Sequence, residues 1–279
     1  MLRTRVITAV LLMAVLLPAL FATSPVPFVL FTLVAISLAG WEWARLNGLP
    51  ERSGAVVCGL LLAVACALGG WQLPLGTGPA WPWWVGAVIW VGIAFVVLRR
   101  GPVGWPGMPR IARVIGGLGL LWLAWWALAE ARVNGINFLL STLCIVWAAD
   151  IAAYFGGRAF GKRKLAPSIS PGKSWAGVYS GMLGVLVLAA LWLAADARWN
   201  FDSVSLFSAL HARLGVLGLV VSCLGLAALS VVGDLFESLV KRAAGAKDSS
   251  ALLPGHGGVL DRIDALLPVL PAAMALAHL

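Results

Sequence analysis

Long runs of hydrophobic residues, separated by short polar segments, extend along the whole chain. Most of these runs approach the ~20 residues that an α-helix needs to cross ~30 Å of hydrocarbon. The last run is shorter, because Ala265 to Leu279 covers 15 residues and contains two prolines. The pattern predicts nine membrane-spanning helices, at about 6–22, 26–44, 54–70, 83–98, 111–130, 136–155, 175–195, 215–233 and 265–279.

The composition agrees with this pattern. Hydrophobic residues make up 61% of the 279 positions and charged residues only 11%, whereas roughly a quarter of a soluble globular protein is charged. No repeat, low-complexity tract or long polar linker divides the chain. We therefore expect an all-α, polytopic integral membrane protein with a single membrane domain over residues 1–279. The first run is expected to stay as a helix, because no good small-residue cleavage site follows it.

The basic residues indicate how the helices are oriented, because short cytoplasmic loops are enriched in Lys and Arg. With nine spans, 17 of the 20 Lys and Arg residues lie on the side of the N-terminus, and Arg132, Arg198 and Arg213 lie opposite. The N-terminus is therefore predicted to be cytoplasmic and the C-terminus to lie outside. Basic loops beside anionic headgroups account for most of the net charge of +9, so no nucleic-acid partner is expected.

Polar residues are distributed unevenly between the two halves of the chain. From residue 1 to 149 they are confined to short loops, so this half is predicted to be mainly scaffold. From 150 to 264, two long polar segments lie on the predicted cytoplasmic side, Arg158–Ser174 and Glu237–Asp264. We therefore expect the catalytic part in 150–264, facing the cytoplasm, with 265–279 as the last span.

Asp234 lies within the eighth apolar run, where an ionised carboxylate is costly unless it is paired or bound to a metal ion. If the helix continues past the run, Ser238 lies one turn after Asp234. Lys241 then lies close to Glu237 and shares a face with Asp234. These contacts favour a functional acid. The alternative is an internal Asp–Lys salt bridge that holds two helices together.

A glycine-rich loop, Pro254-Gly255-His256-Gly257-Gly258, precedes a helix predicted from Val259 onward. Backbone N–H groups at such a helix start attract an anion. Asp261 and Asp264 are three residues apart, so their carboxylates can share one cation, with Arg262 beside them. Together these features predict a metal–phosphate site. His256 alone favours a capping or packing role, and beside Gly257, Gly258 and the acids a phosphate contact becomes a competing interpretation.

The other polar segment ends in Ser170-Pro171-Gly172-Lys173-Ser174. Its Gly-Lys-Ser resembles the end of a P-loop, but the first glycine of that motif is replaced by Pro167 and no strand is expected before it. We therefore exclude a P-loop. A phosphate cradle at the start of the seventh helix is expected instead, with Ser170 and Ser174 as caps and Lys173 reaching the anion. The alternative is a basic loop that contacts lipid headgroups.

The second polar segment closely resembles the phosphatidate cytidylyltransferase family, also called CDP-diglyceride synthetases. The family signature, S-x-x-K-R-x4-K-D-x4-[LI]-P-G-H-G-G-x-x-D-R-x-D, is matched without a gap by Ser238, Lys241, Arg242, Lys247, Asp248, Pro254, Gly255, His256, Gly257, Gly258, Asp261, Arg262 and Asp264. A second stretch similar to the family runs from Asp150 to Gly177. It departs from the family at Ala176, where a glutamate is frequent.

The resemblance implies that CTP and phosphatidate react to CDP-diacylglycerol and pyrophosphate, with Mg²⁺ as cofactor and K⁺ as a candidate second ion. It implies a bacterial inner-membrane enzyme whose active site faces the cytoplasm, with a homodimer as one candidate assembly. The implied metal ligands are Asp234, Asp261 and Asp264, and Lys241 and Arg242 join them as catalytic residues. The implied substrate-binding residues are Asp150, Ser170, Lys173, Ser174, Ser238, Lys247, Asp248, His256, Gly257, Gly258 and Arg262.

Two other functions remain alternatives. A CTP-dependent polyprenol or dolichol kinase has similar metal needs and a different acceptor. An ion-coupled transporter also places acids within its spans, but it predicts acids at the membrane midplane and a repeat between the two halves. Here the acids gather toward the inner face and the halves differ in composition.

Overall fold

The computed structural model describes residues 2–50, 53–72 and 78–279 and is built almost wholly from helices. The first half contains α1 (Leu2–Phe21), α2 (Val26–Leu46), α3 (Gly54–Gln72), α4 (Trp81–Gly92), the π-helical turn η1 (Ile93–Val97), α5 (Leu98–Gly104) and α6 (Arg110–Asn134). The second half contains α7 (Ile136–Phe160), β1 (Lys164–Ala166), β2 (Ser170–Ser174), α8 (Trp175–Arg198), α9 (Leu206–Ala243), α10 (Leu260–Ile263) and α11 (Leu266–Ala277).

The prediction of an all-α, polytopic membrane protein is confirmed. Within the described residues, seven helices are long and apolar enough to cross a membrane, counting Trp81–Gly104 as one. The apolar part of α3, Gly54–Gly70, is shorter. Helix α11 has 12 residues, a length of about 18 Å that by itself does not cross the hydrocarbon layer. The count of nine spans and the orientation of the termini stay predictions.

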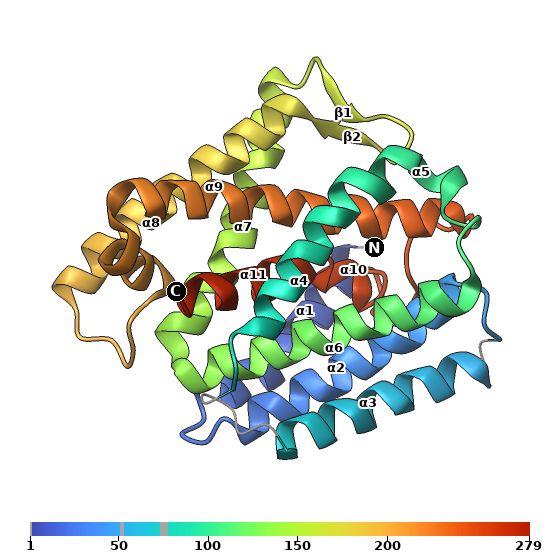
Figure 1. Cartoon of the computed structure of the whole chain (residues 1–279), viewed down its shortest axis with the longest axis horizontal. Coiled ribbons are helices and arrows are strands. Elements are labelled where there is room, and N and C mark those ends of the chain that lie inside the picture. The colour runs from blue at the N-terminus through green and yellow to red at the C-terminus, as the bar shows by residue number, and fades with distance from the viewer. Residues whose placement is uncertain (1, 51–52, 73–77) are drawn as a thin grey trace.

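A two-stranded antiparallel hairpin, β1–β2, interrupts the helical pattern between α7 and α8. No strand was expected here from the sequence, and that expectation was wrong. Strands of three and five residues are too short to show a hydrophobic alternation. Pro167 and Pro171 also disfavour a helix over these positions. The hairpin lies at the top of the molecule in Figure 1 and places Lys173 and Ser174 on its second strand.

Helix α9 extends well beyond the predicted span of 215–233. It covers 38 residues and is broken at Gly215, where φ is 67° and ψ is −173°. The predicted span therefore begins at the break, but the helix continues to Ala243, past the end of the apolar run. Asp234, Ser238 and Lys241 consequently lie on one helix, as the sequence predicted.

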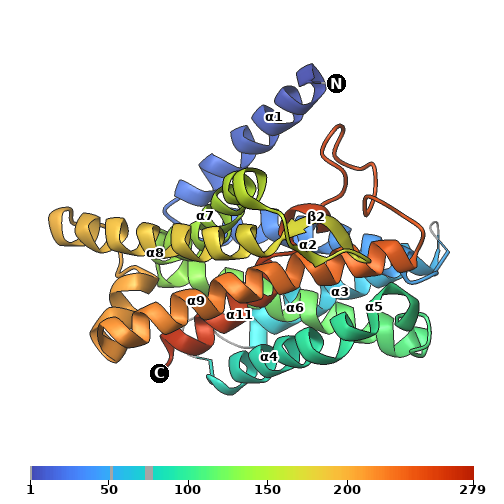
Figure 2. The same ribbon diagram turned by 90° about the horizontal axis from the view of Figure 1, so that it is seen from above.

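Helix α9 runs across the whole molecule (Figures 1 and 2). Helices α7 and α8 pack against each other and against α9, and α2 packs against α3 and α6. The short helix α11 is buried among α4, α6, α7 and α9. Helix α1 projects from the body, as Figure 2 shows. The site therefore lies where the second-half helices meet the polar end of α9.

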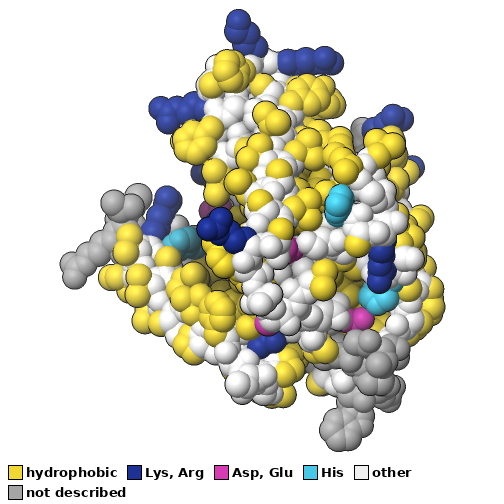
Figure 3. Space-filling model, turned by 90° about the vertical axis from the view of Figure 1, so that its left-hand side faces the viewer, with side chains coloured by type: hydrophobic (Ala, Val, Ile, Leu, Met, Phe, Trp, Pro, Cys, Tyr) yellow, Lys and Arg dark blue, Asp and Glu magenta, His cyan; other side chains and the backbone are white. Residues whose placement is uncertain are grey.

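The outer surface of the molecule is largely apolar. Figure 3 shows a face on which hydrophobic side chains predominate and charged side chains are scattered. Long apolar side chains such as Leu60, Ile111 and Leu183 are more than half exposed. Inside, four aromatic rings meet around α9, from Trp43, Trp90, Trp105 and Phe236. An apolar exterior over helices of this length is what a lipid environment requires.

Candidate active site

The polar end of α9 presents a row of functional side chains. The Ser238 hydroxyl donates to Asp234 Oδ1 over 3.3 Å, one helical turn away. Lys241 Nζ lies 2.5 Å from Glu237 Oε2, and these two side chains are only 12% and 2% exposed. The predicted helix continuation and the predicted proximity of Lys241 to Glu237 are both confirmed. Glu237 thus belongs to the site, although the sequence analysis did not assign it a role.

Asp261 is the partner that joins α9 to the glycine-rich loop. Its Oδ1 accepts from Lys241 Nζ at 2.6 Å, and its Oδ2 accepts from the Gly258 N–H at 2.7 Å. The Ser249 N–H and hydroxyl donate to the same Oδ2 over 2.9 and 2.8 Å. Burial alone would raise the pKa of Asp261, but the hydrogen bond from Lys241 and those from Gly258 and Ser249 outweigh it and lower the pKa to about 2.

Glu42, on α2 in the predicted scaffold half, is a site residue that the sequence analysis missed. Its carboxylate is fully buried and accepts from the Val259 and Leu260 N–H groups over 3.0 and 2.7 Å. The Ser250 hydroxyl donates to the same carboxylate, and the Ser249 hydroxyl, whose one proton is shared with Asp261, lies 3.2 Å from Glu42 Oε2. An acid inside an apolar run was a usable signal, because such residues are rarely without a function.

The backbone N–H groups of the glycine-rich loop were predicted to bind a phosphate. In the structure those of Gly258, Val259 and Leu260 are taken by the carboxylates of Asp261 and Glu42. An anion does occupy the start of α10, as the helix-terminus argument requires, but it comes from the protein. The prediction of a phosphate contact at these N–H groups is therefore not met by the observed geometry.

A second cluster of charge lies where β2, α7 and α9 meet. Lys173 Nζ forms an ion pair with Asp234 Oδ2 at 2.5 Å, which links the hairpin to α9. The Asp150 carboxylate on α7 is within electrostatic reach of both side chains. The Asp–Lys salt bridge that was the alternative interpretation of Asp234 is therefore present, and its lysine is Lys173.

Asp264 lies against the same cluster. A Cβ placed on Gly233 would be 2.3 Å from the Asp264 carbonyl oxygen, so α9 and the α10–α11 segment approach closely only because residue 233 is glycine. Burial and the charge of Asp234 raise the pKa of Asp264 to about 7. Asp234 and Asp264 therefore repel each other while Lys173 and Lys241 attract both segments.

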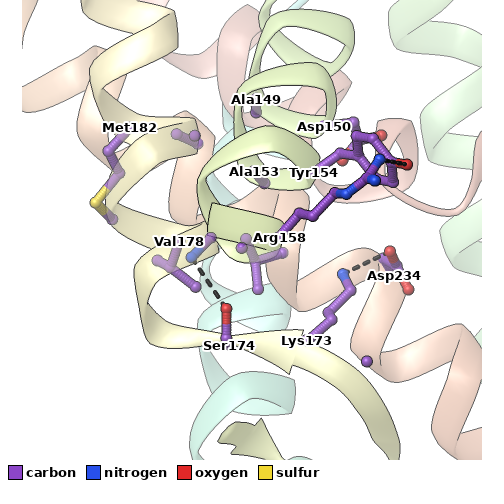
Figure 4. Close-up of a pocket in the computed structure, with 16 residues that line it drawn as sticks. Ala149, Asp150, Ala153, Tyr154, Arg158, Lys173, Ser174, Val178, Met182 and Asp234 are labelled. Atoms are coloured by element: carbon purple, nitrogen blue, oxygen red, sulfur yellow. Dashed lines mark hydrogen bonds and ion pairs between the residues drawn. The ribbon is translucent and has the colours of Figure 1, made fainter. Parts of the chain in front are cut away.

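A cavity of about 480 Å³ opens beside the Lys173–Asp234 pair. Figure 4 shows Asp150, Arg158, Lys173 and Asp234 around its polar part, with the Arg158 guanidinium 3.5 Å from the Tyr154 hydroxyl. The rest of the lining is apolar and comes from α7, α8 and α9. It includes Ala149, Ala153, Val178, Met182, Ala227 and Val231. One cavity thus combines a charged part with an apolar wall.

The predicted metal ligands separate into two groups. Among the described residues, no three or more His, Cys, Asp or Glu side chains are positioned together to hold a metal ion. The Asp261 oxygens are already engaged by Lys241, Gly258 and Ser249, so this carboxylate does not fit as a ligand in the observed arrangement. Asp234 and Asp264 fit better, because their oxygens have fewer partners: Asp234 contacts Ser238 at one oxygen and Lys173 at the other, and Asp264 Oδ1 accepts from the Ala265 N–H. Carboxylate oxygens are the hard donors that Mg²⁺ prefers.

The other predicted residues fall inside or outside the cavity. Ser174 caps α8, where its hydroxyl accepts from the Gly177 N–H over 3.2 Å, so that predicted cap is confirmed. Ser170 lies on β2 and does not cap the helix. Five more lie on the end of α9, in the loop or on α10, outside the cavity lining: Arg242, Lys247, Asp248, His256 and Arg262.

Arg262 and His256 hold the loop itself. The Arg262 guanidinium donates to the His256 carbonyl over 2.6 Å, and the His256 N–H donates to the Leu253 carbonyl over 2.8 Å. Gly257, with φ of 84°, completes this turn. Their observed role is therefore to shape the loop.

Comparison with known proteins agrees with this geometry. The family described as the cytidylyltransferase family matches residues 3–279. The chain belongs to the cytidylyltransferase family. It is 41% identical to a phosphatidate cytidylyltransferase of Pseudomonas aeruginosa over 99% of this chain and 97% of that protein. It is 36% identical to the one of Haemophilus influenzae, over 97% and 96% of the two chains.

A third relative extends the comparison. The phosphatidate cytidylyltransferase of Brucella suis is 35% identical over all of this chain and 92% of that protein. Membership of the family makes the chain a nucleotidyltransferase enzyme of the membrane, which confirms the resemblance found in the sequence. The comparisons do not favour a polyprenol kinase or a transporter.

Proposed function

We propose that this enzyme transfers the cytidylyl group of CTP to phosphatidate, which yields CDP-diacylglycerol and pyrophosphate. The observation that supports the proposal is the cavity at the Lys173–Asp234 pair, where charged side chains stand beside an apolar wall. A lipid phosphate needs both surfaces at once, since its headgroup is anionic and its acyl chains are apolar. The names of the relatives point to the same substrates.

The chemistry needs little proton transfer. An oxygen of the phosphatidate monoester, already ionised at neutral pH, attacks the α-phosphorus of CTP, and the bond to the pyrophosphate oxygen breaks. The two substrates together bring about six negative charges, so the site has to align them and neutralise their charge. Lys173 and Arg158 at the cavity, with Lys241 nearby, are the cations we assign to this task.

We assign Asp234 and Asp264 as the residues that would hold Mg²⁺. The bound ion would neutralise charge on the triphosphate during transfer. Lys173, which pairs with Asp234, would stand beside such an ion and contribute a further positive charge toward the substrate phosphates. Asp261, in contrast, is assigned to holding Lys241. A K⁺ ion and a homodimer stay predictions.

We further propose that the enzyme resides in the bacterial inner membrane with the hairpin on the cytoplasmic side. The hairpin region contains Lys162, Arg163 and Lys164, all exposed, and this position suits a cytoplasmic loop beside anionic headgroups. The cavity mouth next to β2 would then be open to soluble CTP, while its apolar wall faces the bilayer.

The deciding experiment is pyrophosphate release by the purified protein in detergent micelles. We expect release only when CTP, phosphatidate and Mg²⁺ are all present, and omission of each one serves as its control. Replacement of phosphatidate by a polyprenol tests the kinase alternative, because a CTP-dependent kinase releases CDP instead of pyrophosphate. Folded protein that releases no pyrophosphate from the complete mixture would contradict the proposal.

A further inference from the structure

Glu42 is a buried acid on α2. This helix belongs to the first half of the chain, and both polar segments belong to the second half. Its side chain is fully buried, yet four donors converge on its two oxygens. All four come from the segment Ser249–Leu260, more than 200 residues away in sequence. A buried carboxylate is tolerated only when it is fully hydrogen-bonded, so Glu42 and this segment have to fit each other.

Two of the four donors belong to the start of α10. The N–H groups of Val259 and Leu260 donate to separate oxygens of the Glu42 carboxylate. Val259, the residue at the N-cap of α10, has no capping side-chain bond of its own. Glu42 therefore does from another helix what an N-cap side chain does locally, and satisfies two backbone donors at once.

Of the other two donors, Ser249 connects Glu42 to the charged residues of the site. The Ser249 hydroxyl lies 3.2 Å from Glu42 Oε2 and 2.8 Å from Asp261 Oδ2. Asp261 in turn holds Lys241 Nζ at 2.6 Å. Gly258 lies between the two acids, because its N–H donates to Asp261 Oδ2 and a Cβ there would be 2.2 Å from Glu42 Oε1 and 2.0 Å from Ser249 Oγ. A short chain of hydrogen bonds thus runs from α2 to α9.

We propose that Glu42 is a positioning residue of the active site: its carboxylate fixes the segment Ser249–Leu260 and, through it, Asp261 and Lys241. The part of this inference that concerns catalysis rests on the proposed function. The part that concerns the segment does not. Glu42 lies outside the cavity lining, so its effect on the reaction passes through these partners.

The variant Glu42→Gln tests the geometry. It keeps the shape of the side chain but turns one oxygen into an NH₂ group, which cannot accept from a backbone N–H. Whichever way the amide faces, either Val259 or Leu260 loses its acceptor. Glu130→Gln is the matched control, because Glu130 is also a buried acid of a long helix but lies on α6 near His278.

Amide hydrogen exchange of the full-length protein in micelles, well below its melting temperature, gives the first readout. We expect exchange at Val259 and Leu260 to rise at least tenfold in Glu42→Gln and to stay within twofold of wild type in Glu130→Gln. A general loss of stability would instead raise exchange throughout the helices. Unchanged exchange at both amides would overturn the inference.

Turnover gives the second readout. We expect kcat of Glu42→Gln to fall at least tenfold with a smaller change in KM for CTP, because the cavity lining is intact and only the charged partners move. Loosened amides with unchanged kcat would overturn the positioning role. If wild type itself releases no pyrophosphate, the proposed function fails, and the exchange result alone decides whether Glu42 fixes the segment.

A milder variant covers the case in which Glu42→Gln does not fold. Ser250→Ala removes one hydroxyl that donates to Glu42. Ser250 does not contact Asp261, and this variant leaves the Glu42 carboxylate in place to accept from the backbone N–H groups. We expect a smaller rise in exchange at Val259 and Leu260, about threefold, and a matching loss of kcat. No change in either quantity would count against the inference.

Discussion

At the scale of single residues, the site depends on which carboxylate neutralises which lysine. Lys173 pairs with Asp234, and Lys241 pairs with both Glu237 and Asp261. The second group is nearly buried, so removal of one member leaves charge that water cannot reach. Breaking such a pair costs about 3–5 kcal/mol when no other partner remains. The first pair is a quarter to a third exposed and borders the cavity, which suits a pair that opens when substrate binds.

Lys173→Ala should reduce turnover by about 100-fold, because it removes the cation at the cavity mouth. Lys164→Ala is the matched control, since Lys164 lies on the same hairpin and is exposed. We expect that control to stay within threefold of wild type. Initial rates of pyrophosphate release decide the matter, and equal rates for the two variants would remove Lys173 from the site.

Asp261→Asn should lower both turnover and thermal stability. The amide keeps only one accepting oxygen, so it cannot accept from Lys241 and from the Gly258 and Ser249 N–H groups together, and it no longer neutralises Lys241. Glu237 still contacts Lys241, so we expect a loss of about 1–3 kcal/mol, less than for an isolated buried charge. A melting curve in micelles measures this loss, with the exposed Asp248→Asn as the stability control. An unchanged melting temperature would contradict the observed hydrogen bonds.

At the scale of elements, three connections bring the site together. The extension of α9 beyond its apolar run places Asp234 to Lys241 on one helix face. The β1–β2 hairpin folds back so that Lys173 reaches that helix. The loop before α10 is held on α2 by Glu42. Each connection joins elements that are distant in sequence, so a change in one element alters the charge arrangement of the others.

Gly258→Ala tests the packing of the loop on α2. The added methyl group would overlap Ser249 Oγ and Glu42 Oε1, which forces the segment away from Asp261. We expect activity to fall at least tenfold and exchange at Leu260 to rise. Gly225→Ala is the control on α9, where no heavy atom lies within 4 Å of an added Cβ. Wild-type activity in Gly258→Ala would show that the loop adapts without consequence.

At the scale of the whole molecule, the structure is a helical body whose exposed side chains are mostly apolar and whose charges gather near the polar end of α9. A second polar cluster lies elsewhere, where Asp202 accepts from the Ile136 and Asn137 N–H groups at the start of α7. Asp196 accepts there from Asn137. This cluster satisfies helix ends and includes no lysine, in contrast to the candidate active site. The two clusters therefore serve different purposes.

The predicted orientation is tested with single cysteines and a membrane-impermeant maleimide. We expect Lys164→Cys in the hairpin to react only from the cytoplasmic side, and Asn200→Cys in the loop before α9 to react only from the outside. The parent protein, with its native cysteines at 58, 66, 144 and 223, gives the background. Reaction of both positions from one side would contradict the nine-span topology.

The sequence by itself determined the fold class, the positions of the long helices and the two polar segments that supply most of the candidate site, but not Glu42 or Glu237. Hydrophobic run length follows from bilayer thickness, and this relation is local, so it can be read from one chain. The helix through Asp234 to Lys241, the cap at Ser174 and the helix at Asp261 were likewise predictable, because each depends on near neighbours.

Only the tertiary structure decided the partners. Glu42 lies over 200 residues from the loop it holds, and Lys173 lies 61 positions before Asp234, with a whole membrane helix between them. Asp261 and Asp264 are three residues apart but lie near different residues of α9. Asp261 accepts a hydrogen bond from Lys241, whereas the charge of Asp234 acts on Asp264. Such pairings depend on how helices pack and on where buried charge can be satisfied, and no local pattern encodes either.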